Sequence, residues 1–442
     1  MVRENLRRLW GHPRFRRILE VRISTQAADG ILQVGMASYV LLSPEQQPDA
    51  WSIAMVLAIT LLPFSLVGPF ISLALDRWSR QRILVGTDGI RCLIGIALAF
   101  LVWDGARSPA EHSALLVLLL VAMSLNRFLL AALTAGLEHT IDRREYLVAS
   151  SIMPTIGPLG LMIGAGIAAA VRLLGARVMP VHQADSLIFA ISAVLFAVSV
   201  GLGTRFGRTE LGPVTPDHSE SAGDVLAGLA RGVRHLRSLP AVRSGLVLIG
   251  AQRLLFGVYS VAMILGYRNL LHPTDDIAGA MGDMTLWAVA MGAGFVLSAP
   301  FMPVLVHATG MRRALTALLV ATAVVQVAPG MVINRWTLLV AAFFIGLFGQ
   351  SVKAGVDTIC QAHVEEAYKG RVFIVYDMIY NSLFVAGSAI AALLLPVTGL
   401  DHRHLAALAA AYLAVGVAFW VASGCHAPQF ARGTALGEDP LS

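Results

Sequence analysis

Apolar and polar residues alternate along the chain in long blocks. Each apolar block is long enough to cross a bilayer core as a helix, which takes about 20 residues. Short polar segments separate the blocks. We predict twelve transmembrane helices, at residues 18–42, 51–75, 83–103, 113–138, 149–172, 183–203, 242–267, 280–306, 314–333, 336–358, 371–396 and 404–423.

Composition supports an all-α polytopic membrane protein. Of the 442 residues, 57% are hydrophobic and only 14% are charged, and the mean hydropathy is +0.72. So few charges cannot cover a soluble protein of this size, and the same figures exclude intrinsic disorder. The three cysteines, Cys92, Cys360 and Cys425, are scattered and lack the spacing of metal ligands. We therefore expect no metal and no cofactor.

The basic residues predict the orientation in the membrane. With the N-terminus inside, the cytoplasmic segments hold 22 Arg and Lys residues and the outer segments hold six. By the positive-inside rule this bias places both termini in the cytoplasm. The basic segment 1–17 is expected on the inner face rather than as a cleaved signal peptide, and 424–442 is expected to form a cytoplasmic tail. Arginines clustered between apolar blocks indicate topology, so the net charge of +6 does not point to nucleic acid.

The chain divides into two similar halves. We expect a six-helix bundle at 18–203, a cytoplasmic linker with an amphipathic helix at 204–241, and a second six-helix bundle at 242–423. The polar loop from Asp76 to Leu84 is echoed by the loop from His307 to Leu315, with a shared basic pair and closing Leu. Such repeats are typical of secondary transporters, whose substrate site lies between the halves near the bilayer midplane.

The loop after the second predicted helix resembles the signature loop of the major facilitator superfamily. That loop reads Gly-x-Leu-x-Asp-Arg-x-Gly-Arg-Lys with a downstream Leu. The segment from 72 to 84 departs from it at Ser72, Ala74, Ser79 and Gln81, and matches it at Asp76, Arg77, Arg80 and Leu84. The resemblance implies two pseudo-symmetric bundles in the major facilitator fold. It also implies that Asp76, Arg77 and Arg80 latch the cytoplasmic side.

Shorter matches are similar to the drug:proton antiporter-3 branch, which includes macrolide and siderophore exporters. They lie at 68–70 (Gly-Pro-Phe), 88–91 (Asp-Gly-Ile-Arg), 232–237 (Gly-Val-Arg-His-Leu-Arg) and 370–373 (Gly-Arg-Val-Phe). A Gly-Pro element at 157–160 also resembles the antiporter motif of efflux members, although it is incomplete.

The first predicted helix carries a polar face. Arg22, Gln26, Asp29 and Gln33 recur at helical spacing, which puts them on one side over three turns. An ionisable residue at mid-membrane costs about 2.5–3.5 kcal/mol on insertion scales, so it usually has a partner or a use. Asp29 is our candidate for proton binding, with Arg127 on the fourth helix as its helper. The alternatives are a structural Asp29 paired with an arginine on a neighbouring helix, and Arg127 as a plain counter-ion.

Other polar residues in the spans are candidates for lining the central cavity. Lys353 and Asp357 are four residues apart and can pair within their helix. For this group, cavity lining and helix–helix locking both remain open. Asp88 and Arg91 are expected to form a structural pair. The full set of cavity-lining candidates is Arg22, Gln26, Gln33, Gln252, Arg253, Gln350, Lys353, Asp357, Asp377 and Asn381.

These observations favour proton-coupled antiport and efflux of a hydrophobic or amphipathic small molecule by alternating access. An uptake symporter and a lipid or lysophospholipid flippase on the same fold are the alternatives. An enzyme is disfavoured because the chain holds no nucleophile–base or metal motif such as His-Glu-x-x-His. The expected partners are a small-molecule substrate, protons and the lipid bilayer of the cell membrane, and we expect a monomer.

Overall fold

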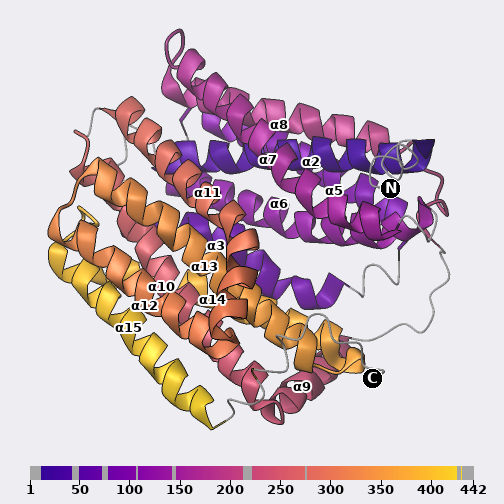
Figure 1. The fold of residues 1–442 in the computed structure, drawn as a ribbon. Coiled ribbons are helices and arrows are strands. Elements are labelled where there is room, and N and C mark those ends of the chain that lie inside the picture. The colour runs from indigo at the N-terminus through magenta and orange to yellow at the C-terminus, as the bar shows by residue number, and fades with distance from the viewer. Residues whose placement is uncertain are drawn as a thin grey trace. The chain divides into compact units, whose positions relative to one another are not determined.

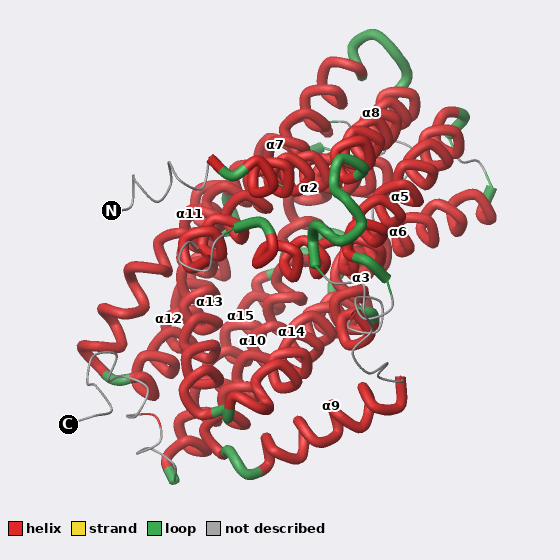
Figure 2. Tube along the Cα trace, turned by 90° about the vertical axis from the view of Figure 1, so that its right-hand side faces the viewer, coloured by secondary structure: helices red, strands yellow, loops and turns green. Residues whose placement is uncertain are grey.

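The protein is described by a computed structural model that covers residues 11–41, 49–71, 78–105, 108–141, 146–212, 222–273, 276–425 and 430. Within these ranges the regular structure is entirely helical (Figure 2). A long helix stands at each of the twelve predicted spans (Figure 1). The first six are α2 (Pro13–Leu41), α3 (Ala50–Leu66), α5 (Arg80–Trp103), α6 (Pro109–Gly136), α7 (Tyr146–Gly175) and α8 (Val181–Gly203). The second six are α10 (Pro240–Leu265), α11 (Ile277–Thr309), α12 (Met311–Met331), α13 (Arg335–His363), α14 (Glu366–Leu394) and α15 (His402–Gly424).

Ten segments among the described residues are long and apolar enough to cross a membrane; α2 and α12 are the long helices outside that set. Large apolar side chains lie exposed on these helices, including Leu93 and Phe100 on α5 and Val296 on α11. A surface of this kind fits lipid rather than water. The fold is therefore that of an all-α polytopic membrane protein, as predicted.

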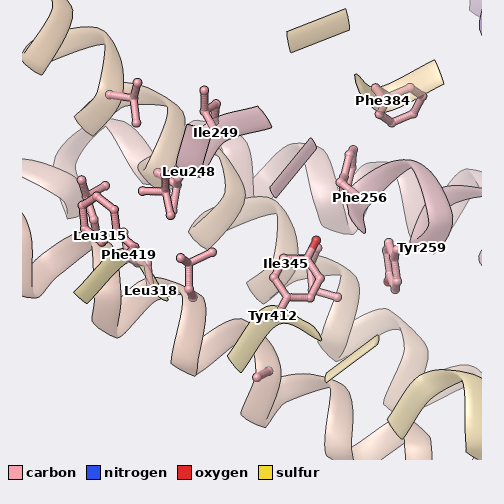
Figure 3. Packing of buried hydrophobic residues seen from close by; sticks show 14 of the residues in the cluster. Leu248, Ile249, Phe256, Tyr259, Leu315, Leu318, Ile345, Phe384, Tyr412 and Phe419 are labelled. Atoms are coloured by element: carbon pink, nitrogen blue, oxygen red, sulfur yellow. The ribbon is translucent and has the colours of Figure 1, made fainter. Parts of the chain in front are cut away.

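The chain forms two compact units. The first comprises Met1–Gln46 and Leu62–Val225, and the second comprises Gln47–Leu61 and Leu226–Ser442. The two predicted halves fall into these units, except that the first part of α3 belongs with the second unit. There Leu57 and Leu61 pack against its main apolar cluster. Figure 3 shows part of that cluster, in which Tyr412 lies beside Ile345.

Each unit repeats the packing of the other. In the first unit α2 packs on α7 and α8, while α5 packs on α6 and α8. In the second unit α10 packs on α14 and α15, while α12 packs on α13 and α15. The same helices, counted from the start of each half, therefore meet in both units. This arrangement confirms the pseudo-symmetry that the loop repeat predicted.

The α2–α7 crossing is so close that backbone touches backbone. A Cβ atom on Gly30 would overlap the carbonyl oxygen of Leu161, and a Cβ atom on Gly164 would overlap the carbonyl oxygen of Ala27. Only glycine permits such an approach. The crossing thus holds the polar face of α2 in a fixed register within the first unit.

The α10–α14 crossing in the second unit is built in the same way. A Cβ atom on Gly257 would overlap the carbonyl oxygen of Phe384, and one on Gly387 would overlap that of Leu254. In both crossings the glycine follows the contacted residue of its own helix by three positions. The duplicated unit is therefore recognisable at the level of single contacts.

The predicted linker helix is present as α9 (Ala222–Arg237). It lies against α14, because Gly228 and Gly232 leave room for the Arg371 side chain. His235 stacks on Tyr368 with ring centroids 4.3 Å apart. The boundaries of the linker at 204 and 241 remain a prediction.

Candidate functional site

Asp29 is completely buried, and its carboxylate forms an ion pair with the guanidinium of Arg91 on α5. Gln26, one turn earlier on α2, donates a hydrogen bond from Nε2 to Asp29 Oδ2 at 3.0 Å. The spacing of the polar face accounts for this contact, since residues three apart meet on one side of a helix. The mid-span carboxylate of α2 therefore has a charged partner inside the first unit.

Arg91 also binds a second carboxylate. Its Nη1 lies 3.0 Å from Asp88 Oδ1, one turn earlier on α5. Thr25 of α2 donates to the same Asp88 oxygen at 3.1 Å, and Arg91 Nη1 donates to Thr25 Oγ1 at 3.1 Å. The guanidinium carbon lies 4.1 Å from the ring centre of Phe196 on α8. We call the polar residues of this site the acid–arginine cluster: Thr25, Gln26, Asp29, Asp88 and Arg91.

The cluster joins residues that the sequence had kept apart. The predicted Asp88–Arg91 pair is present, but the same arginine also serves Asp29. The ion pair of Asp29 is made with Arg91, and Arg127 on α6 lies close enough to Arg91 for the two like charges to repel. The spacing of Asp88 and Arg91 predicted their pairing within one helix. It gave no information about which other helix would contribute a carboxylate to Arg91.

The two remaining residues of the α2 polar face lie outside the cluster. Arg22 packs against α7, where its Nη2 would lie 3.1 Å from a Cβ atom on Gly157. Gln33 is half-buried. The position of both residues on the first helix fits the predicted cavity-lining role, which stays a prediction.

A second buried ionic site in the first unit was missed by sequence reasoning. Arg172 of α7 lies 3.0 Å from Asp185 of α8, and Ser38 of α2 donates to Asp185 at 2.7 Å. Arg172 Nε in turn donates to Ser38 Oγ at 2.7 Å. One cation faces one anion here, so the charges balance and a structural role is sufficient. The sequence feature that could have indicated this site is Asp185, a lone acidic residue near the start of an apolar span.

In the second unit, α10 and α13 bring three of the predicted residues to one small pocket. Gln252, Arg253 and Gln350 line it together with aromatic side chains. Gly349 allows the close approach, because a Cβ atom there would lie 3.1 Å from Gln252 Nε2. The predicted pair within α13 is confirmed, with Lys353 Nζ 2.8 Å from Asp357 Oδ2.

The two cavity-lining candidates on α14 differ in their exposure to the surroundings. Asp377 is exposed, while Asn381 is buried and donates to the Asp377 backbone carbonyl at 2.9 Å. Of the predicted latch, Asp76 and Arg77 lie outside the described residues. Arg80 donates from Nη1 to the Leu211 carbonyl at 2.6 Å and lies 3.1 Å from His139 Nδ1.

A polar cluster also lies where α11 begins. His272 contacts Asp276 at 2.9 Å and Asp283 at 3.1 Å, and Arg335 of α13 lies 3.0 Å from Asp283. Burial alone would lower the pKa of His272, but the hydrogen bonds to the two carboxylates outweigh it and raise that pKa. The hydrogen bond with His272 lowers the pKa of Asp276. Within the described ranges, no group of three His, Cys, Asp or Glu side chains could hold a metal ion.

The long apolar helices and the buried ionic sites are those of a multi-pass membrane protein. Two relatives, the MFS-type transporters Mb0038c of Mycobacterium bovis and Rv0037c of Mycobacterium tuberculosis, are each 31% identical over 397 residues. The alignments cover 89% of this chain and 86% of each relative. The chain therefore belongs to the MFS-type transporters, as the signature loop implied.

Solved structures agree on the fold. A mutant of the nucleoside transporter NupG superposes with a TM-score of 0.68 at 13% identity, covering 92% of this chain and 98% of NupG. The POT family transporter PepTSo superposes with a TM-score of 0.66 at 12% identity, covering 95% of this chain and 99% of PepTSo. At such identity the likeness concerns the fold alone. No protein-family model matches the chain.

Proposed function

We propose that the protein is a proton-coupled exporter of a hydrophobic or amphipathic small molecule and that the acid–arginine cluster is its coupling site. Membership of the MFS-type transporters supports transport of a small molecule. The observation that carries the coupling is the charge of the cluster, in which two fully buried carboxylates share one guanidinium. The drug:proton antiporter-3 branch, with its motifs along the chain, is part of the same proposal.

Because the cluster has one more carboxylate than it has cations, it can bind one proton. A buried charge without a partner is expensive, and an ion pair compensates only one of the two carboxylates. A proton on Asp29 or Asp88 makes the cluster neutral. Loss of that proton leaves one surplus negative charge, which favours a conformation that admits water or another cation. Proton binding can therefore bias a switch between two states.

Charged residues near the cluster influence how readily it binds and releases a proton. Arg127 of α6 adds positive charge on the side of Arg91, and Arg22 lies on the same face of α2, seven residues before Asp29. Cys92 follows Arg91 on α5, and Phe196 of α8 covers the guanidinium. Arg127 would thus influence proton release through its repulsion of Arg91.

Coupling is testable without knowledge of the substrate. The full chain is reconstituted in liposomes loaded with a pH-sensitive dye, and a pH gradient is imposed. A panel containing a lipophilic cation, an aromatic carboxylate and a fluorescent lysophospholipid is screened for compound-dependent proton flux. Asp29→Asn and Asp88→Asn each leave one carboxylate on Arg91, so both variants should bind substrate but fail to pump it against a gradient.

The control is Asp185→Asn, which changes a buried carboxylate of the same unit outside the cluster and should keep proton coupling. Gradient-driven pumping with wild-type pH dependence by either Asp29→Asn or Asp88→Asn would contradict the charge argument. Accumulation in the same direction as the proton would make the protein an uptake symporter. Movement of the lysophospholipid between leaflets without proton flux would make it a flippase.

The cytoplasmic latch is proposed on the family match alone. Asp76→Asn should slow transport while expression and substrate binding persist, because the lost charge is used in only one conformation. Equal loss of folding and binding would make Asp76 a structural anchor.

A further inference from the structure

Arg253 of α10 is a cation held between aromatic rings in the second unit. Its guanidinium carbon lies 3.9 Å from the ring centre of Tyr380, 4.7 Å from that of Phe384 and 5.2 Å from that of Phe256. Phe384 and Phe256 pack on each other with centroids 5.7 Å apart. Three rings from α10 and α14 thus surround one guanidinium, and Figure 3 shows Phe256 and Phe384 in this region.

The charge of Arg253 is not neutralised by the part of the chain that the structure describes. No described carboxylate lies within 4.0 Å of Arg253, and its Nε is buried without a hydrogen-bond acceptor. Asp357 on the neighbouring helix α13 already forms an ion pair with Lys353. Lys353 itself lies 5.5 Å from the Tyr380 ring centre, which adds a second cation near the same ring.

The chemistry of the guanidinium determines what Arg253 can bind. A guanidinium carries five N–H donors, all in its plane, and contact with aromatic rings does not satisfy them as hydrogen bonds would. A guanidinium edge matches a carboxylate, sulfonate or phosphate with two parallel hydrogen bonds. The pocket beside Arg253 is lined by Gln252 and Gln350, which offer polar atoms, and by Phe295 and Ile345, which offer apolar surface.

We propose that Arg253 binds the anionic group of the transported molecule. The substrate class is thereby narrowed to amphipathic anions with a carboxylate, sulfonate or phosphate. This inference rests on the proposed transport function, whose direction and coupling it does not require. The anion can be a soluble molecule or a lipid headgroup, because both present the same chemistry to a guanidinium.

The test measures binding rather than transport, so that it can fail independently of proton coupling. The full chain is placed in nanodiscs of zwitterionic phosphatidylcholine, and its melting temperature is titrated with three probes. These are 1-naphthoate, its uncharged methyl ester, and 1-naphthylmethylamine, which carries the opposite charge. A parallel set of nanodiscs contains lysophosphatidylglycerol as the lipid anion.

The wild type should bind 1-naphthoate or lysophosphatidylglycerol more tightly than the ester and the amine. Arg253→Gln should weaken anion binding by about tenfold to a hundredfold, the usual effect of losing a charged hydrogen bond. Arg253→Lys should retain part of it. The matched control is Arg243→Gln, which removes an exposed arginine from the same helix and should change nothing.

Preference for naphthoate would identify a soluble anion, and preference for the lysolipid would identify a lipid headgroup. The proposal is overturned if the ester binds as well as the acid, if neither anion binds the wild type, or if Arg253→Gln binds anions normally. Intact anion binding in a protein that fails the proton-flux assay would instead count against proton coupling alone.

Discussion

Replacement of Arg91 by methionine is the most direct perturbation of the acid–arginine cluster. Methionine keeps much of the length and volume of the side chain but removes its charge. The Arg91 side chain is fully buried, and it is the ion-pair partner of both Asp29 and Asp88. The variant therefore leaves two carboxylates in a dry interior without their cation.

Breaking a buried ion pair by removing one partner costs about 3–5 kcal/mol, because the remaining charge is uncompensated. For a unit of this size, 1 kcal/mol corresponds to about 2–4 °C in melting temperature on the scale of soluble domains. Arg91→Met should therefore lower the melting temperature by about 6–20 °C. The control Arg82→Met removes an exposed arginine from the same helix and should shift it by less than about 2 °C.

The assay is thermal unfolding of the purified full chain in one detergent and at one scan rate, followed by intrinsic fluorescence. A triple variant separates charge from packing. Asp29→Asn and Asp88→Asn combined with Arg91→Met leave no charge in the cluster, so most of the lost stability should return. The reasoning is refuted if Arg91→Met melts like the wild type, or if the triple variant melts as low as Arg91→Met.

Three further predictions concern other parts of the chain. Gly257→Ala should lower the free energy of unfolding by about 1–3 kcal/mol, because the new methyl group overlaps the Phe384 carbonyl oxygen; wild-type melting would show that α10 and α14 can move apart. The raised pKa of His272 means that its protonated form stabilises the fold below about pH 6.5 and that this contribution disappears as pH rises through the raised value. Melting of the wild type should therefore fall more between about pH 6 and pH 8 than melting of His272→Gln, and equal slopes would exclude a contribution from the imidazolium. A cysteine introduced at Ser219 should react in intact cells only with membrane-permeant reagents, whereas labelling by an impermeant reagent would reverse the predicted orientation.

The positions of the helices could be read from the sequence because a bilayer helix has a nearly fixed length. Their ends were less accurate, since polar residues extend helices beyond the apolar block: α2 begins at Pro13, five residues before the predicted span. The pair of Lys353 and Asp357 was also predictable, because residues four apart on one helix must be neighbours. Local spacing is sufficient for contacts of this kind.

Contacts between helices were not accessible in the same way. The sequence placed Asp29 on a polar face and paired Asp88 with Arg91, but joining them requires knowledge that the side chains of Thr25 and Asp29 on α2 reach α5. The cage around Arg253 likewise combines α10 with α14, which are separated by more than a hundred residues. One sequence gives no information on such pairings, because packing rather than periodicity decides them.

The repeated glycine crossings let the two halves be compared residue by residue. Ala27 and Gly30 occupy the positions of Leu254 and Gly257, so Gln26 corresponds to Arg253. By the same count, Asp29 corresponds to Phe256. Equivalent positions of the two repeats therefore carry different chemistry, which is acidic in the first half and cationic and aromatic in the second. The glycine crossings set the same backbone geometry in both halves, and the side chains placed on it set the electrostatics of each site.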